Sequence, residues 1–220
     1  MDEVWSDPTV VEISLRTLAV SCVATVAALV AGVPVGYLLG RTRFRGQTFL
    51  FAAVNTGMGV PPVVVGLVVW LLLVRSGPLG ALELIYTKTA MVLAQFLISM
   101  PIVVGFTAAS IEALPPQLPD LLHVLGAGRL RRMWLIAREA RLGLLAGIMA
   151  AFGGIVSEVG ASMTVGGNLQ GETRVLTTAI VTETSRGNID RSLALGVILL
   201  SLTFTLNLGL TLIQQRRRKS

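Results

Sequence analysis

Five long apolar segments dominate this chain, and each is long enough to cross a membrane as a helix. A transmembrane helix needs about 20 mostly apolar residues. Only 14% of the 220 residues are charged, whereas a soluble domain carries about 25%. We therefore predict an all-α membrane protein with a single transmembrane domain over residues 1–220. The expected spans are about 12–40, 48–74, 89–111, 142–164 and 192–213.

Prolines interrupt three of these segments, at Pro34, at the pair Pro61 and Pro62, and at Pro101. In membranes such prolines mark kinks or close packing, because neighbouring helices satisfy the freed backbone groups. The stretch GMGVPP at 57–62 predicts that the second segment is discontinuous. A break of this kind is consistent with a pathway lining and equally with a packing kink.

Basic residues lie between the apolar segments in three groups, and this distribution sets the expected topology. With five spans, all three groups fall on one side, and the positive-inside rule makes that side cytoplasmic. We therefore expect the N-terminus outside and the C-terminus in the cytoplasm. The net charge of +6 then reflects topology and does not predict nucleic-acid binding. The groups are Arg41, Arg43 and Arg45; Arg129, Arg131, Arg132, Arg138 and Arg141; and Arg216, Arg217, Arg218 and Lys219.

The expected cytoplasmic loop, 112–141, is too long for a simple connector between helices. Its apolar residues recur at helical spacing on both sides of Gly126 and Gly128, which predicts two short amphipathic helices joined at these glycines. Either a hairpin on the lipid surface or a docking element for a cytoplasmic partner fits this periodicity. The first set is Leu118, Leu121, Leu122 and Leu125, and the second is Leu130, Met133, Trp134 and Ala137.

The segment from Asp120 to Ala127 resembles the coupling loop of ABC importer permeases, whose pattern is EAAxxxG. Gly126 falls on the glycine of that pattern, and Leu125 and Ala127 match its usual neighbours. The departures are Asp120 in place of Glu, the pair 121–122 in place of two alanines, and the absence of the closing Leu-Pro.

A second resemblance lies at 158–187, which begins EVGASMTVGGNLQGETRVLTTAI. It is similar to the region after the fourth span in molybdate, sulfate and tungstate permeases, and most similar to the tungstate branch. The resemblance implies a MetI-like bundle of the type I importers in a bacterial or archaeal plasma membrane. It also implies a pore made with a second copy of the chain, a cytoplasmic ABC ATPase and an extracytoplasmic oxyanion-binding protein.

The chain has no phosphate-binding loop, because it contains no Gly-Lys pair and only two lysines, Lys88 and Lys219. We therefore expect no enzyme activity and no cofactor in this chain, with ATP bound by the partner subunit. One cysteine, Cys22, and one histidine, His123, predict no metal site.

The resemblance implies how the chain meets its ATPase. As a hypothesis, Leu121, Leu122 and Leu125 pack into a groove on that subunit. Gly126 then lets the two backbones approach each other, with Asp120 and Ala127 flanking the contact.

The resemblance also implies a pathway or gate at the far end of the fourth span. A tetrahedral dianion in transit needs hydrogen-bond donors, such as backbone amides in glycine turns and hydroxyls, and no fixed cation is expected here. Helix capping and turn formation explain the same residues equally well. We expect an external loop at 165–191 with a short helix. The candidates are Glu158, Gly160, Ser162, Thr164, Gly166, Gly167 and Asn168.

Glu158 is the exception in this set, because a carboxylate repels an oxyanion and is costly inside a bilayer. We expect a structural or gating function for it. The expected substrate is tungstate, with molybdate or sulfate as alternatives. A stand-alone secondary transporter or channel is the alternative from another class, and it leaves the amphipathic loop unexplained.

Overall fold

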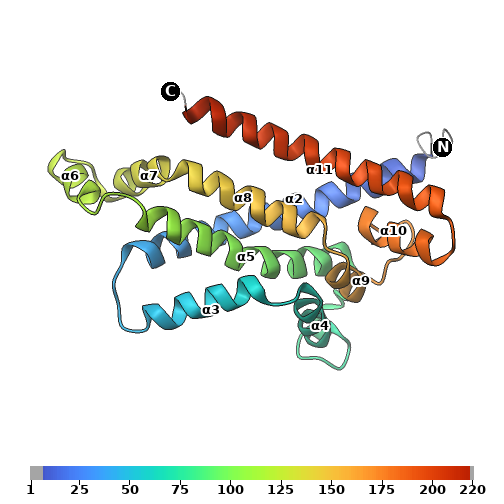
Figure 1. Cartoon of the computed structure of the whole chain (residues 1–220). Helices are drawn as coiled ribbons and strands as arrows, with labels where there is room; N and C mark the ends of the chain where they lie inside the picture. The colour runs from blue at the N-terminus through green and yellow to red at the C-terminus, as the bar shows by residue number, and fades with distance from the viewer. Residues whose placement is uncertain (1–6, 219–220) are drawn as a thin grey trace.

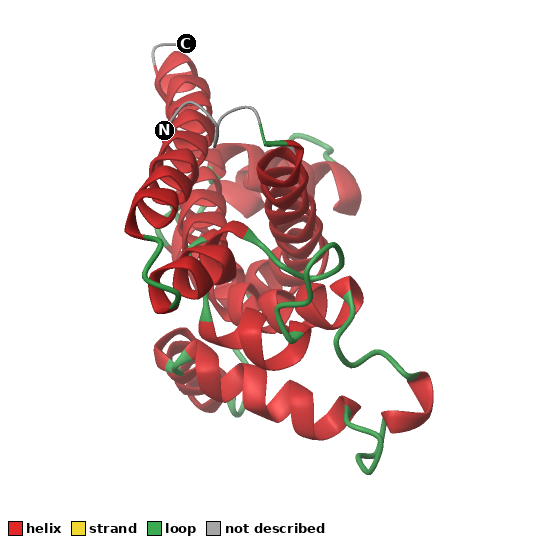
Figure 2. Cartoon of the chain, turned by 90° about the vertical axis from the view of Figure 1, so that its right-hand side faces the viewer, coloured by secondary structure: helices red, strands yellow, loops and turns green. Residues whose placement is uncertain are grey.

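The computed structural model describes residues 7–218, which fold into helices with no β-strand among them (Figure 1, Figure 2). The all-α prediction is confirmed for this part of the chain. The helices are α2 (Pro8–Arg41), α3 (Gln47–Gly59), α4 (Pro62–Leu73), η1 (Gly80–Leu82), α5 (Lys88–Glu112), α6 (Leu118–Val124), α7 (Arg129–Glu139), α8 (Arg141–Val156), α9 (Gly160–Gly166), α10 (Leu176–Ser185) and α11 (Ile189–Arg218).

The helices α2 and α5 pack side by side along their length because α2 carries glycine at every fourth position, at Gly32, Gly36 and Gly40. A Cβ atom built on Gly32 would lie 2.9 Å from a methyl group of Val103, and one on Gly40 would lie 2.5 Å from the carbonyl oxygen of Ala108. The two helices run parallel, since residue numbers rise together along the contact. Small residues at this spacing let membrane helices approach closely.

The main buried cluster surrounds α5 and joins it to α2, α4 and α9. Close contact between α4 and α9 again depends on glycine: a Cβ atom on Gly66 would lie 2.6 Å from the Cα atom of Ala161. The short helix α9 is therefore fixed against both α4 and α5. This packing positions the stretch 157–168, which contains the candidate gate.

Three helices, α2, α5 and α11, are each long and apolar enough to cross a membrane. The second expected segment is two helices, α3 and α4, which meet at an angle of 100°. The predicted discontinuity is confirmed, and its cause is Pro61, which lacks a backbone N–H and restricts Val60 to an extended conformation.

The prediction of one continuous helix over 142–164 is wrong. The helix α8 ends at Val156, and its 16 residues span about 24 Å, less than the roughly 30 Å apolar thickness of a bilayer. Residues 157–159 break the helix before α9. The helices α7 and α8, bent by 69°, form a second broken pair, so the described helices give three spans, or five if each bent pair forms one.

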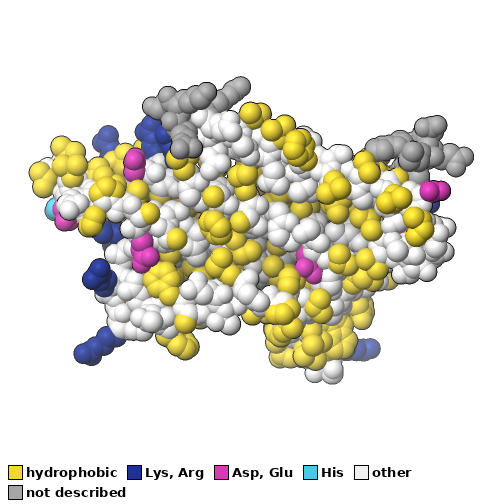
Figure 3. Space-filling model, viewed as in Figure 1, with side chains coloured by type: hydrophobic (Ala, Val, Ile, Leu, Met, Phe, Trp, Pro, Cys, Tyr) yellow, Lys and Arg dark blue, Asp and Glu magenta, His cyan; other side chains and the backbone are white. Residues whose placement is uncertain are grey.

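Two of the three arginine groups meet at the end of the bundle that carries α6 and α7. Arg41, at the end of α2, and Arg129 and Arg132, on α7, line one cavity. Most basic side chains visible in Figure 3 gather at this end, and the described chain begins at the opposite end (Figure 1). The third group, 216–219, lies outside the residues whose side chains are described.

Candidate functional site

Glu158 lies in the break between α8 and α9, where its side chain and its backbone carbonyl each accept a hydrogen bond from a following segment. Its Oε1 atom accepts from the backbone N–H of Ala161 at 3.0 Å, and its backbone carbonyl accepts from the hydroxyl of Thr177 at 3.0 Å. The carboxylate thus satisfies one of the free amides at the start of α9. Glu158 is half-buried. Its carboxylate therefore caps α9, whereas the contact with Thr177 of α10 is made by its backbone carbonyl.

The expected hydrogen-bond donors of α9 do not share one open surface. Ser162 is 1% exposed, and its hydroxyl has no hydrogen-bond partner within the described residues. The hydroxyl of Thr164 donates to the carbonyl of Gly160 one turn earlier, at 2.8 Å. Gly166 is buried, and its carbonyl accepts from the hydroxyl of Thr173. Half-exposed Thr164 is therefore the hydroxyl of this helix that lies nearer to the surface.

Gly167 and Asn168 form the turn that ends α9, and both have left-handed backbone conformations, with φ of 68° and 51°. The N–H of Gly167 donates to the carbonyl of Met163 at 2.9 Å, which is a helix C-cap. The Asn168 amide is also satisfied: Nδ2 donates to Thr182 Oγ1 at 2.7 Å, and Oδ1 accepts from Arg174 Nε at 3.2 Å. Helix capping therefore accounts for Gly167, and the contacts with Thr182 and Arg174 account for the side chain of Asn168.

The expectation of no fixed cation near this turn is wrong. Besides Arg174, the structure places Arg16 of α2 beneath the 169–175 loop, with only 5% of its surface exposed. Its guanidinium donates to the carbonyl oxygens of Gly171 at 2.7 Å and Arg174 at 2.9 Å, and it also pairs with Glu12. The sequence did contain a signal for Arg16, because a charged residue inside an apolar membrane segment usually has a specific function.

Next to this loop is a cavity of about 200 Å³ with charges of both signs. Burial, together with the positive charges of Arg186 and Arg191, lowers the pKa of Arg174, while Glu183 opposes this shift. Glu183 is itself buried and accepts from Arg186 at 3.2 Å and from Asn188 Nδ2 at 2.8 Å. The mixture of charges suits a fixed structural contact better than a strong anion site.

At the opposite end of the bundle, α6 and α7 confirm the predicted pair of short helices. Gly126 has φ of 76° and follows α6. Its N–H donates to the carbonyl of His123, and that of Ala127 donates to the carbonyl of Leu122, each at 3.0 Å. This is the Schellman arrangement, which requires a left-handed residue at the position of Gly126. The backbone conformation alone thus explains the glycine at position 126, without any contact with a partner.

The leucines of α6 divide between two environments. Leu122 packs against a buried cluster that contains Ile111 and Ile136. Leu121 and Leu125 are 56% and 71% exposed, and Val124 between them is 84% exposed. Of the three expected leucines, Leu121 and Leu125 are therefore exposed together with Val124, whereas Leu122 packs against the chain itself. Helical spacing is consistent with Val124 on the same face as Leu121 and Leu125, but the sequence did not show which face of α6 packs against the rest of the chain. The flanking Asp120 is exposed, and Ala127 is half-buried.

Comparison with known proteins shows relatives along most of the chain. A probable anion ABC transporter permease protein of Haloferax volcanii is 40% identical over 90% of this chain and 87% of its own length. The tungstate uptake system permease protein TupB of Peptoclostridium acidaminophilum is 39% identical over 91% and 88%. The molybdenum transport system permease protein ModB of Escherichia coli K12 is 30% identical over 76% and 77%.

Solved structures confirm the expected fold. The chain superposes on a subunit of the MetNI methionine ABC transporter with a TM-score of 0.75, at 19% identity over 94% of this chain and 95% of that one. An amino acid ABC transporter gives 0.70 at 19% identity, over 98% and 97%. Residues 32–219 also match a family described as the inner membrane component of binding-protein-dependent transport systems. With this match and these relatives, the chain belongs to the family of binding-protein-dependent transport system inner membrane components.

Proposed function

We propose that this chain is the transmembrane permease subunit of an ABC importer for an oxyanion, and that its substrate is tungstate. The observation that carries the proposal is the gradient of similarity. The relatives named for an anion and for tungstate are 40% and 39% identical over nine-tenths of the chain. The molybdenum permease is 30% identical, and the sulfate permease CysT of Salmonella typhimurium is 26% identical.

In this proposal the α6–α7 end faces the cytoplasm, and the α10 end faces the outside. The arginines at the α6–α7 end support this orientation through the positive-inside rule. The exposed residues of α6 give the ATPase an apolar contact, and the binding protein contacts α10 and the 169–175 loop. A second copy of the chain completes the pore, and ATP is bound and hydrolysed by the ATPase subunit.

The proposed pathway follows α9 from its start, beside the breaks at 60–61 and 157–159, to the turn at Gly167 that ends it. Thr164 is the half-exposed hydroxyl along this helix, and Gly167 at its end is exposed. Glu158 does not contact the anion; its carboxylate caps the start of α9 and so holds the helix in position. Arg16 and Arg174 fix the loop that follows, so the cations near the gate are occupied by the chain's own oxygen atoms.

Uptake of radioactive tungstate tests this proposal in cells that lack the chain and in cells that carry it again on a plasmid. We expect restored tungstate uptake that excess molybdate inhibits weakly and excess sulfate does not inhibit. Restored uptake of molybdate or sulfate, and not of tungstate, contradicts the substrate. Restored uptake in cells that also lack the ATPase subunit contradicts the ABC mechanism and favours a stand-alone transporter.

A further inference from the structure

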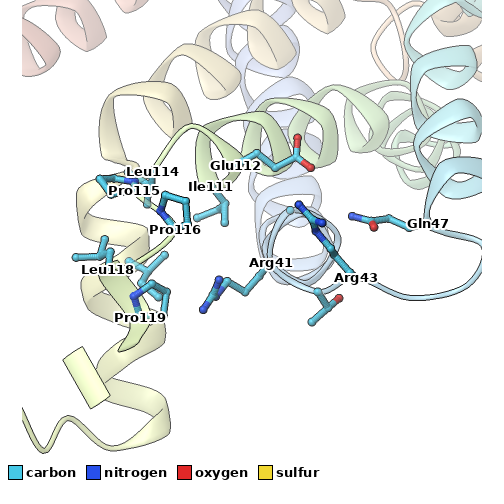
Figure 4. A pocket seen from close by; sticks show the side chains of 13 residues that line it. Arg41, Arg43, Gln47, Ile111, Glu112, Leu114, Pro115, Pro116, Leu118 and Pro119 are labelled. Carbon is cyan, nitrogen blue, oxygen red and sulfur yellow. The ribbon is translucent and has the colours of Figure 1, made fainter. Parts of the chain in front are cut away.

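A cavity of about 430 Å³ lies at the α6–α7 end of the bundle, between the last turns of α2 and the first turns of α7. A second cavity, of about 340 Å³, adjoins it and shares Arg41, Thr42, Pro119 and Ile136 with the first. Figure 4 shows the second cavity, with Arg41 extending from the end of α2 toward the proline-rich turn at Pro116 and Pro119. Neither cavity contains a residue of the candidate gate.

Three guanidinium groups line the larger cavity, those of Arg41, Arg129 and Arg132, and we call this set the arginine pocket. Within the described residues, none of the three makes a hydrogen bond or an ion pair. No acidic side chain lines the same cavity. Like charges around one hollow repel each other, and an anion between them removes the repulsion and supplies hydrogen-bond acceptors.

The remaining walls of the larger cavity are mostly apolar. Pro34 and Leu38 come from the membrane-spanning helix α2, and Met133 and Ile136 come from α7. On its other side, Leu38 lines a further hollow of about 320 Å³ with apolar neighbours. Cations therefore lie where α2 ends, and apolar grooves run back along α2 on both sides of Leu38.

We propose that the arginine pocket binds the phosphate of an anionic phospholipid, with the acyl chains in the grooves beside Leu38. Basic pockets between helices at the membrane surface bind lipid headgroups in this manner. A free phosphate compound offers the same phosphate group but has no acyl chains to fill the grooves. The acidic surface of a soluble partner would leave them empty as well. The apolar wall on a membrane-spanning helix favours the lipid.

The test measures phosphatidylglycerol bound to the purified transporter complex by native mass spectrometry, with phosphatidylcholine as the neutral comparison. The variant Arg41→Gln/Arg129→Gln/Arg132→Gln should bind phosphatidylglycerol about 100-fold more weakly, because each basic residue near an anionic surface contributes roughly fivefold. Arg131→Gln is the matched control, since Arg131 is exposed on α7 and does not line the cavity. Replacing all three arginines by lysine should preserve most of the binding and shows that the site still folds.

Leu38→Gln and the soluble probe glycerol 3-phosphate separate the sources of the phosphate. We expect Leu38→Gln to weaken lipid binding and millimolar glycerol 3-phosphate to compete poorly. Equal lipid binding by the glutamine triple variant and Arg131→Gln would overturn the proposal. It would also fail if glycerol 3-phosphate displaced the lipid while Leu38→Gln had no effect. If the glutamine triple variant lost co-purification of the ATPase but bound lipid unchanged, the pocket would be assigned to ATPase contact instead.

Discussion

Replacing Arg16 by methionine should loosen the 169–175 loop. Methionine keeps much of the length and packing of the side chain but removes the donors to the carbonyl oxygens of Gly171 and Arg174. A hydrogen bond to a charged group contributes about 1.5–3 kcal/mol, so two such bonds near the lower limit contribute about 3 kcal/mol. The pair with Glu12 adds little, because the Glu12 side chain is 56% exposed.

Hydrogen exchange of the loop amides measures this loss directly. A change of about 3 kcal/mol in local opening corresponds to roughly 150-fold faster exchange. The amides to follow are those of Thr173 and Arg174, which donate to the carbonyl of Leu169, and that of Leu176, which donates to the hydroxyl of Thr17. Amides in the middle of α5 should not change.

Two control variants make the result specific to the carbonyl contacts. Glu12→Gln removes the exposed ion pair and should change exchange by less than about fivefold. Arg16→Lys keeps the charge but loses the two-pronged geometry, so its effect should be intermediate. Unchanged exchange in Arg16→Met would refute the reasoning and would mean that the loop is held by its own internal hydrogen bonds.

Four further predictions concern other parts of the chain. Gly36→Leu should destabilise the α2–α5 contact by about 1–3 kcal/mol, since a Cβ atom there would lie 2.6 Å from that of Thr107, and a lower melting temperature in detergent would show it. Gly126→Val should reduce ATPase co-purification whereas Gly126→Asn should not, because asparagine tolerates positive φ; equal effects would contradict the capping argument. Glu158→Gln should retain transport, because an amide oxygen still caps α9, and Glu158→Ala should lose most of it in an uptake assay. Hydrogen bonds from Thr9 and the charge of Arg191 lower the pKa of Asp7. The contribution of Asp7 to stability is therefore present above its unfolded pKa and lost as pH falls through the lower folded pKa. In Asp7→Asn the melting temperature should depend less on pH below about pH 4.

Local sequence patterns predicted the features that depend on nearby residues. Apolar length located the three long helices α2, α5 and α11, the prolines at 61–62 located the break between α3 and α4, and glycines flanked by spaced leucines located α6 and α7. Each of these signals acts within a few residues, as helix caps, proline breaks and helical periodicity do.

Features that depend on distant contacts were missed or predicted incorrectly. The end of α8 at Val156 has no strong local signal, and the Glu158 carbonyl in the break is bonded by Thr177, 19 residues later. Arg16 has partners 155 and 158 residues away. Helical spacing showed that Leu122 lies on an apolar face, but only the fold showed that it packs against its own chain.

Transport by the reconstituted complex tests the central claim most directly. The chain is placed in liposomes with its ATPase subunit, the oxyanion-binding protein and radioactive tungstate outside, and ATP is enclosed within. We predict tungstate uptake that requires ATP hydrolysis and the binding protein, and that stops when the ATPase is omitted. Uptake that continues without ATP or the ATPase, or a complete complex that transports no oxyanion, would contradict the account.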